Sequence, residues 1–472
     1  MDRGAGSACG VTEKDETMAT ADPKAAFTGD FERLREGLPG RGAAWLDALR
    51  RDAISAFALA GFPGVRDEDW KYTNILPALK DRLEPVLDSE AAAVDDSRLR
   101  PLVSQASGIT ADAPLVVFVD GHFRASLSRP GGSVAGASVR LSSLRERLAT
   151  DPQQLEPWLG RYLPVAAHGF AALNTAFLDD GAVIEIAEGA INEQPLHVVY
   201  LATRRERPFV AYPRNVVIAG PRSSALVVEH YIGEDGARCL TNAASEVVLR
   251  SGAVLGHVRI QDEAKSSFHV ARVEVEQGPG SNFVSHAFGF GAALSRTELT
   301  VRLAGEQAEC RMSGLYAMDG SRHVDHHVTI DHCAPHTRSD QLFKGILDDK
   351  SRGVFTGRVL VRAGSQKIRA MQKNPSILLG EGAVAETRPQ LEIYADDVVC
   401  NHGATVGRLD ESALFYLLSR GIDPREARRL LVAGFAAEVV ESVVPETLRH
   451  ALTAMVGERI RALGTAAKGQ AA

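Results

Sequence analysis

The sequence predicts a mainly β protein whose core is a long stack of short strands, with a helical region on either side of it. From Val183 to Cys400, β-rich runs recur about every 10–15 residues, and no helical period of useful length interrupts them. Many runs alternate apolar and polar side chains, as in residues 296–303. This pattern indicates a sandwich, a barrel or a solenoid. Because roughly 200 residues are long for one sandwich, a stacked β-helix is the preferred interpretation, although no strict sequence repeat is visible.

Changes in composition divide the chain into regions. Residues 1–24 are small and polar, lack the apolar segment of a secretory signal, and contain acids that a transit peptide avoids. They are interpreted as a leader without stable structure, in which Met18 is a second candidate for the natural start. The remaining regions are a helical cap with a small β element at 25–178, the β-helix core at 179–404, a helical region at 405–464, and a frayed tail at 465–472.

The N-terminal cap carries mainly helical signals. Residues 43–60 place apolar side chains at helical spacing and end at a Gly-Phe-Pro sequence. Asp120-Gly121 predicts a hairpin turn within residues 115–123. Trp70 and Tyr72 are expected to be ordinary core aromatics, because large aromatic side chains are usually buried.

The C-terminal region predicts three helices. Asp410 is a good N-cap for the first, and Gly421 lies where a helix-ending glycine is expected. Asp423-Pro424 opens the second helix with an N-cap and a proline at its first position. The third runs from Pro445 to near Leu463. The arginines on the second helix (Arg425, Arg428, Arg429) are by themselves typical of a solvated face.

Composition excludes several classes of function. The chain has 472 residues, with 53 Lys and Arg against 60 Asp and Glu, so its formal charge of −7 gives no general attraction to nucleic acid or anionic membranes. No apolar run is long enough for a bilayer span. The five cysteines are scattered and form no Cys-x-x-Cys pair, which suits free thiols in a reducing cytoplasm. No P-loop, nucleophile elbow or His-Glu-x-x-His sequence occurs, so any ATP chemistry must come from a partner.

The histidine-rich stretch from His323 to His336 is the first candidate site. On a strand, His323, Asp325 and His327 share one face, a conceivable facial metal triad for a metal-dependent small-molecule enzyme. His326 and His332 share the other face. We interpret these histidines mainly as hydrogen-bonding groups inside the solenoid rather than as a permanent metal site.

The second candidate lies in the last predicted strand, residues 392–407. Side chains alternate along a strand, so Cys400 and His402 point the same way and Asn401 points the opposite way. A thiol and an imidazole side by side form half a site for a soft or borderline metal. Since two ligands are too few for a closed site, the others must come from another surface.

This stretch closely resembles the corresponding segment of the SufB/SufD family of iron–sulfur cluster assembly scaffolds, and of its SufD branch in particular. The family usually reads Cys-Ser-His-Gly where this chain has Cys400-Asn401-His402-Gly403, followed by Phe-Tyr-Leu (415–417) and Ser-Arg-Gly (419–421). Trp70-Lys71-Tyr72-Thr73 matches a second signature of the family. The departure at Asn401 puts little in doubt, because this side chain faces away from the site.

The resemblance implies a right-handed parallel β-helix and a non-catalytic scaffold subunit. It implies a transient iron–sulfur cluster shared with a SufB-like sister subunit, with His402 as a ligand and Cys400 as the weaker candidate. It also implies that a SufC-like ATPase docks on the helices at about 410–460, and that a cysteine desulfurase or sulfur carrier delivers sulfur indirectly. The resemblance leaves open whether a flavin assists reduction during cluster assembly. The alternative is a solenoid carbohydrate lyase or hydrolase, which would need clustered carboxylates on one solenoid face and usually a secretion signal.

Overall fold

The computed structural model describes residues 22–110, 112–129, 138–165 and 169–463. Most of the leader and all of the tail expected from the sequence lie outside the described residues. The first described helix begins at Pro23.

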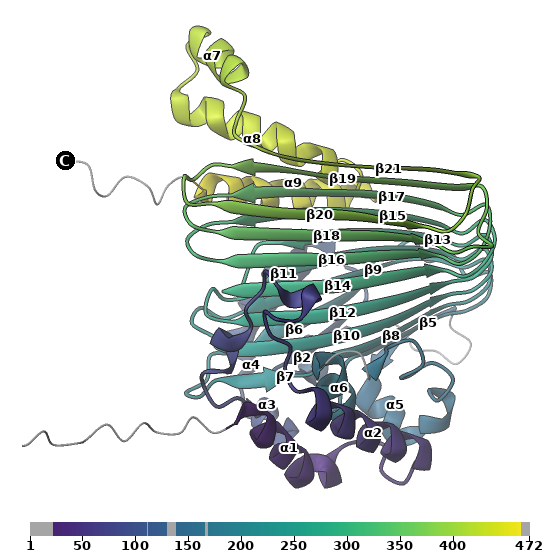
Figure 1. The fold of residues 1–472 in the computed structure, drawn as a ribbon. Helices are drawn as coiled ribbons and strands as arrows, with labels where there is room; N and C mark the ends of the chain where they lie inside the picture. The colour runs from purple at the N-terminus through teal and green to yellow at the C-terminus, as the bar shows by residue number, and fades with distance from the viewer. Residues whose placement is uncertain (1–21, 111, 130–137, 166–168, 464–472) are drawn as a thin grey trace, which may run out of the picture.

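The centre of the molecule is a parallel β-solenoid, as predicted (Figure 1). One sheet has the strand order β20-β18-β16-β14-β12-β10-β8-β5-β4, and the other has the order β21-β19-β17-β15-β13-β11-β9-β6-β2-β3. From β8 to β21, consecutive strands alternate between the two sheets, and each pairs in parallel with the strand one coil away. Antiparallel pairing is found at the N-terminal end, between β2 and β3 and between β4 and β5. The strands of the coils are β5 (Ala182–Ile186), β6 (Leu196–Ala202), β7 (Phe209–Ala211), β8 (Arg214–Ala219), β9 (Ser224–Gly233), β10 (Cys239–Leu249), β11 (Val254–Asp262), β12 (Phe268–Gln277), β13 (Asn282–Gly289), β14 (Leu294–Leu303), β15 (Glu309–Met318), β16 (His323–His332), β17 (Arg338–Leu347), β18 (Arg352–Val361), β19 (Ile368–Leu378), β20 (Val384–Ile393) and β21 (Val398–Gly407).

The main hydrophobic core fills the space between the two sheets. Side chains from successive coils stack there, and Phe283, Val301, Ile330 and Phe355 are each fully buried. Burial of apolar surface is the dominant stabilising contribution, and each coil covers the one before it.

The N-terminal region closes one end of the solenoid (Figure 1). Phe57 of its second helix, Trp70 and Phe170 pack together with strand residues such as Val270. The hairpin at Asp120-Gly121 forms as predicted, with Phe118 opposite Phe123 in an antiparallel pair. The elements of this region are α1 (Pro23–Leu34), η1 (Arg35–Gly37), α2 (Ala44–Ala60), η2 (Glu68–Trp70), η3 (Leu76–Leu79), β1 (Glu84–Pro85), α3 (Asp88–Ala92), α4 (Asp96–Ser107), η4 (Gly108–Thr110), β2 (Leu115–Val119), β3 (His122–Phe123), η5 (Ala125–Leu127), β4 (Val139–Ser143), α5 (Leu144–Thr150), η6 (Pro152–Gln154) and α6 (Gly169–Ala176).

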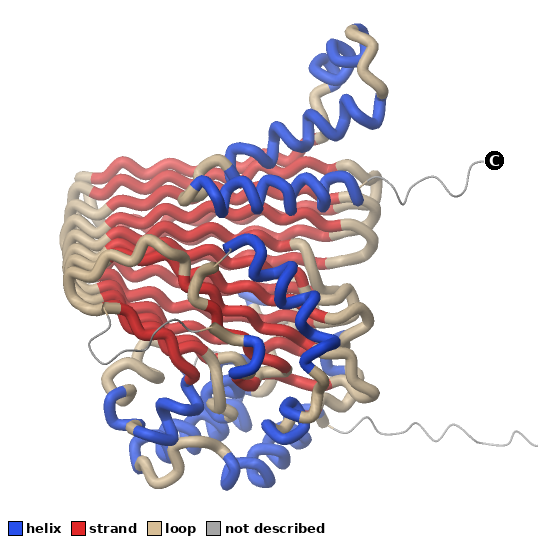
Figure 2. Tube along the Cα trace, turned by 180° about the vertical axis from the view of Figure 1, so that it is seen from behind, coloured by secondary structure: helices blue, strands red, loops and turns tan. Residues whose placement is uncertain are grey.

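Three helices follow the last strand: α7 (Glu411–Ser419), α8 (Pro424–Val440) and α9 (Glu446–Ala462). The predicted caps are present, since the Asp410 carboxylate accepts from the backbone N–H of Ser412 and Asp423 accepts from that of Arg425. Helices α8 and α9 cover the outer face of the sheet that contains β11 and β15, as seen from behind in Figure 2. Helix α7 has no buried residue and stands away from the solenoid.

No helix among the residues described is both long and apolar enough to cross a membrane.

Candidate functional site

The last coil forms an open end of the solenoid. In the part of the chain that the structure describes, β20 pairs only with β18, and β21 pairs only with β19. Among the described strands none lies above these two, so each offers a free strand edge. The inward-facing side chains of this coil are likewise left without a coil above them. Such edges are ready templates for a second chain.

Cys400 and His402 lie on the inward-facing side of this last coil. Cys400 is the register partner of Ala370, and His402 is the partner of Gln372. Ala370 and Gln372 are both buried inside the solenoid, and residues paired in a parallel sheet face the same side. The two candidate ligands therefore point along the surface of the open end, and Asn401 points the other way.

The two candidate ligands differ in exposure. His402 is exposed, whereas Cys400 is half-buried and packs against a cluster that includes Val359, Ile368 and Ala370. Desolvation raises the pKa of the Cys400 thiol, and a backbone hydrogen bond from Ala370 opposes this increase. Because the thiolate is the form that binds metal, this desolvation disfavours metal binding by the Cys400 thiol in the isolated chain.

The last coil also exposes several large apolar side chains, which we call its apolar rim. Large apolar residues of the last coil are unusually exposed, with Tyr394 63% and Val399 61% accessible. Contiguous exposed apolar surface on a globular protein marks an interaction site. Sequence reasoning placed this strand last in the stack but missed the rim, because large apolar residues on a strand are ordinarily expected to be buried. Its members are Val384, Ile393, Tyr394, Val399 and Val406.

The outer face of the histidine-rich strand β16 is covered by the N-terminal region. The Thr73 hydroxyl donates to Asp325 Oδ2 at 2.5 Å and lies 2.9 Å from His323 Nε2. Arg296 forms an ion pair with the same Asp325 carboxylate. The face on which a metal triad was conceivable is thus filled by protein groups, and the cover comes from a segment about 250 residues away in sequence.

The inward-facing histidines of β16 are also held by protein. His332 Nδ1 lies 2.7 Å from the Thr337 hydroxyl, and Nε2 lies 3.0 Å from that of Ser339. His326 packs between the rings of Tyr316 and Phe343. Burial lowers the pKa of His326 and of His332 to about 4, so both rings are neutral near pH 7. These contacts confirm the hydrogen-bonding interpretation for His323 and His332. Among the described residues, no group of three or more His, Cys, Asp or Glu side chains is arranged to hold a metal ion.

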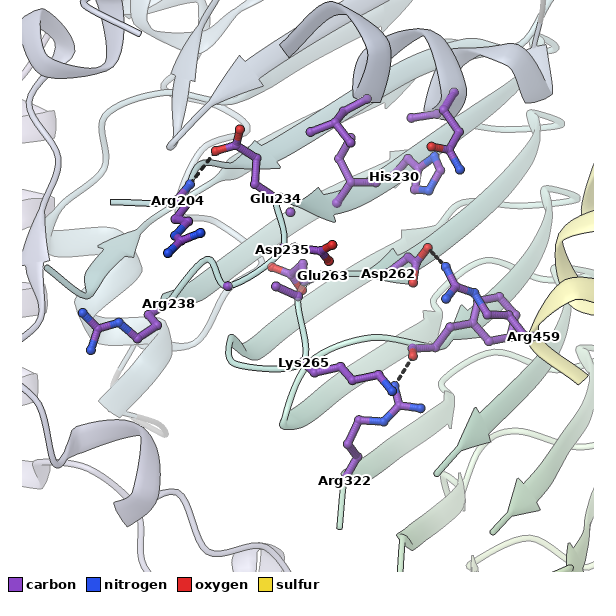
Figure 3. A pocket seen from close by; sticks show the side chains of 18 of the residues that line it. Arg204, His230, Glu234, Asp235, Arg238, Asp262, Glu263, Lys265, Arg322 and Arg459 are labelled. Atoms are coloured by element: carbon purple, nitrogen blue, oxygen red, sulfur yellow. Dashed lines mark hydrogen bonds and ion pairs between the residues drawn. The ribbon is translucent and has the colours of Figure 1, made fainter. Parts of the chain in front are cut away.

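A large polar cavity lies elsewhere, between α4, α9 and the turns that follow β6, β9, β11 and β15 (Figure 3). Its volume is about 1320 Å³. Several charged side chains around it pair with one another: Arg98 with Glu234, Arg322 with Asp319, and Arg459 with Asp262. Positive and negative side chains are therefore mixed around the cavity, and neither charge is concentrated there to select a ligand. The pair between Arg459 and Asp262 also joins the last helix to the solenoid.

Comparison with known proteins accounts for this architecture. Residues 200–435 match the family described as "SUF system FeS cluster assembly, SufBD core domain", and residues 22–198 match "SufBD protein N-terminal region". The chain is 30% identical to the iron–sulfur cluster assembly protein SufD of Escherichia coli (strain K12), over 85% of this chain and 90% of that protein. It is 30% identical to an iron–sulfur cluster assembly SufBD family protein of Synechocystis sp., over 87% of this chain and 90% of that one. It is also 27% identical to the chloroplastic protein ABCI7 of Arabidopsis thaliana, over 92% and 91%. The chain belongs to the SufBD family of iron–sulfur cluster assembly proteins.

Proposed function

We propose that this chain is a non-catalytic scaffold subunit that pairs with a SufB-like sister through the open end of its solenoid. A nascent iron–sulfur cluster, which is the cargo of the complex, is assembled between the two surfaces. A SufC-like ATPase binds the C-terminal helices and supplies the ATP hydrolysis, and a cysteine desulfurase supplies sulfur indirectly. The observation that carries the proposal is the exposed imidazole of His402, on the inner face of a coil that no other described strand covers.

The surface chemistry of the open end supports pairing there. Two free strand edges and an apolar rim with Tyr394 and Val399 exposed would be costly to leave in water, and a second β-solenoid end would cover both. This chain alone offers one imidazole and one half-buried thiol. The remaining ligands therefore come from the sister subunit.

A shared site of this kind suits assembly rather than storage. A cluster held by four cysteines of one chain is bound firmly and serves electron transfer. A cluster held by one or two ligands from each of two subunits can be released when the subunits move apart. His402 is the candidate that contributes an imidazole nitrogen, and Cys400 is the weaker candidate because its thiol is partly desolvated.

The C-terminal helices support docking of the ATPase. Helix α7 buries none of its own residues, and Phe415 and Tyr416 on it are 71% and 57% exposed. Helix α8 joins α7 to the solenoid, where Val439 is fully buried. Movement of the ATPase subunits on binding ATP would act on α7 and be transmitted through α8 to the coils beneath. The complex works in the cytoplasm under this proposal.

Substitution of the candidate ligand tests the proposal. The His402→Ala variant is expected to assemble with the sister subunit and the ATPase in co-purification but to yield no cluster in a reconstitution followed by absorbance and iron content. Asn401→Ala is the matched control, since Asn401 is the adjacent residue on the opposite face and its loss leaves the yield unchanged. An unchanged cluster yield in His402→Ala would refute the role of His402.

A further inference from the structure

A column of inward-facing side chains runs down the solenoid from His402. Register pairing places one residue of each coil directly beneath the next. All members below His402 are buried. In order from the open end, the column is His402, Gln372, Gln341, Met312, Ser285 and His257.

The amide of Gln372 is held in a defined orientation immediately below His402. Its Nε2 donates to Gln341 Oε1 at 3.1 Å. Across the interior, the absence of a side chain at Gly357 makes room for this amide, because a Cβ atom there would lie 1.8 Å from Gln372 Nε2. The end of the Gln372 side chain is therefore fixed by a hydrogen bond below it and by close packing beside it.

The carbonyl oxygen of the same amide has no partner. Gln372 Oε1 is shielded from solvent and accepts no hydrogen bond from any described residue. A buried acceptor without a donor costs on the order of 1–3 kcal/mol, so such groups are rare in native proteins. The residue one strand above it on the same face is His402, whose exposed ring makes no hydrogen bond with the described residues and can rotate about its side-chain torsions.

We infer that Gln372 is a positioning residue for His402, an inference that rests on the proposed function. Paired strands lie about 4.8 Å apart, so a ring N–H of His402 can reach Gln372 Oε1. A neutral imidazole carries its hydrogen on one nitrogen and a lone pair on the other. Donation to Gln372 fixes which nitrogen carries the hydrogen and leaves the other lone pair directed toward the sister subunit, where it binds a soft or borderline metal of the nascent cluster.

The orientation of the Gln341 amide matters to this arrangement. With Gln341 presenting its oxygen to Gln372 Nε2, the free group of Gln372 is an acceptor. If both amides were reversed, Gln372 would present an N–H to the ring and occupy the lone pair that the metal requires. Partners of this kind around a metal-binding histidine typically change metal affinity about 10–100-fold.

Three variants of the full-length chain test the inference. Gln372→Met keeps the shape and removes the acceptor, whereas Gln372→Glu keeps an acceptor oxygen. Asn374→Leu is the matched control, because Asn374 is also a buried amide with an unpartnered carbonyl oxygen on the inner face of β19 but lies beneath Ala404. Long-range ¹⁵N NMR of histidine-labelled protein at about pH 8, where exposed rings are neutral, reports the tautomer of His402. The signal is assigned by its loss in His402→Ala.

The wild-type chain and Asn374→Leu are expected to show one dominant His402 tautomer. Gln372→Met should show a mixture of the two tautomers, as expected for a ring that only water contacts, and Gln372→Glu should restore the dominant form. In the reconstituted complex, cluster yield should fall about 10–100-fold in Gln372→Met and recover in Gln372→Glu. Equal tautomer populations in wild type and Gln372→Met would overturn the inference. His402→Ala then separates the two ideas. If that variant still abolishes the cluster, only the role of Gln372 is rejected. If that variant keeps the cluster, the proposed function is rejected as well.

Discussion

Trp70 fixes the N-terminal segment to the outer face of the solenoid. Its ring stacks on Phe170 with centroids 5.6 Å apart, and the Arg296 guanidinium lies 4.1 Å from its centroid. Two residues further on, Tyr72 lies beneath Arg388 of β20, which also forms an ion pair with Glu68. Trp70 is a buried core residue, as predicted, and the short motif that contains it also spans the outer face of one sheet and reaches the last coil.

The buried histidines make stability depend on pH. Burial lowers the pKa of His332 to about 4, below the value of about 6.5 for an unfolded chain. Above pH 6.5 the ring is neutral in both states and has no effect. As the pH falls from 6.5 toward 4, the unfolded chain takes up a proton that the folded chain does not, so the free energy of unfolding decreases.

His332→Gln should therefore weaken this pH dependence. Wild type should lose up to about 1.4 kcal/mol more per pH unit than the variant between pH 6 and pH 4. Urea denaturation at several pH values measures the difference. If the free energy of unfolding changed with pH by the same amount in both proteins, His332 would not be desolvated in the folded state.

At the scale of elements, the corners of the solenoid depend on close backbone contact between coils. Gly305 follows β14, and a Cβ atom placed there would lie 2.1 Å from the Pro279 nitrogen and 2.3 Å from the Gly278 carbonyl carbon, both in the turn one coil below. These are backbone atoms, so no side-chain rotation can relieve the overlap. The stacking distance between coils itself would have to increase.

Gly305→Ala is therefore expected to lower the free energy of unfolding by about 3 kcal/mol, at the upper end of the usual cost of overpacking. Gly364→Ala, in the turn between β18 and β19, is the control, because a Cβ atom there meets nothing within 4 Å. Denaturation in urea compares the two variants. If both were equally stable, the coils would be able to separate at the corner without cost.

Across the whole molecule, the sequence was most informative where strands alternate and least informative where buried polar groups interrupt the pattern. The apolar run at 247–249 predicted only the end of β10, which in fact begins at Cys239. Its earlier residues include Asn242 and Glu246, which are polar but buried. Asn242 donates to the Phe170 carbonyl, and Glu246 pairs with Arg214. These partners come from other coils and from the N-terminal region, so local alternation cannot reveal them.

The candidate site shows the same limit. Alternation correctly placed Cys400 and His402 on one side of a strand, and the helical sequence that follows correctly marked this strand as the last of the stack. The sequence could not show that Gln372 lies beneath His402, because this register depends on the length of the whole coil between β19 and β21, which includes β20 and the two turns beside it. The cover over β16 comes from Thr73, about 250 residues away. Contacts of that range are set by tertiary packing alone.

The C-terminal helices separate two roles that sequence periodicity merges. Apolar residues occur on α7 and α8 alike, yet Phe415 on α7 is 71% exposed and Val439 on α8 is fully buried against the solenoid. Under the proposed function, Phe415 contacts the ATPase and Val439 stabilises the fold.

Phe415→Ala should weaken binding of the ATPase subunit at least about 10-fold, as loss of an aromatic anchor does, and should leave the free energy of unfolding unchanged. Val439→Ala should lower that free energy by about 1–3 kcal/mol through the cavity it leaves and should keep the ATPase bound. Calorimetric titration with the ATPase and urea denaturation of each variant measure the two effects. Full ATPase affinity in Phe415→Ala would place the docking surface elsewhere than on α7.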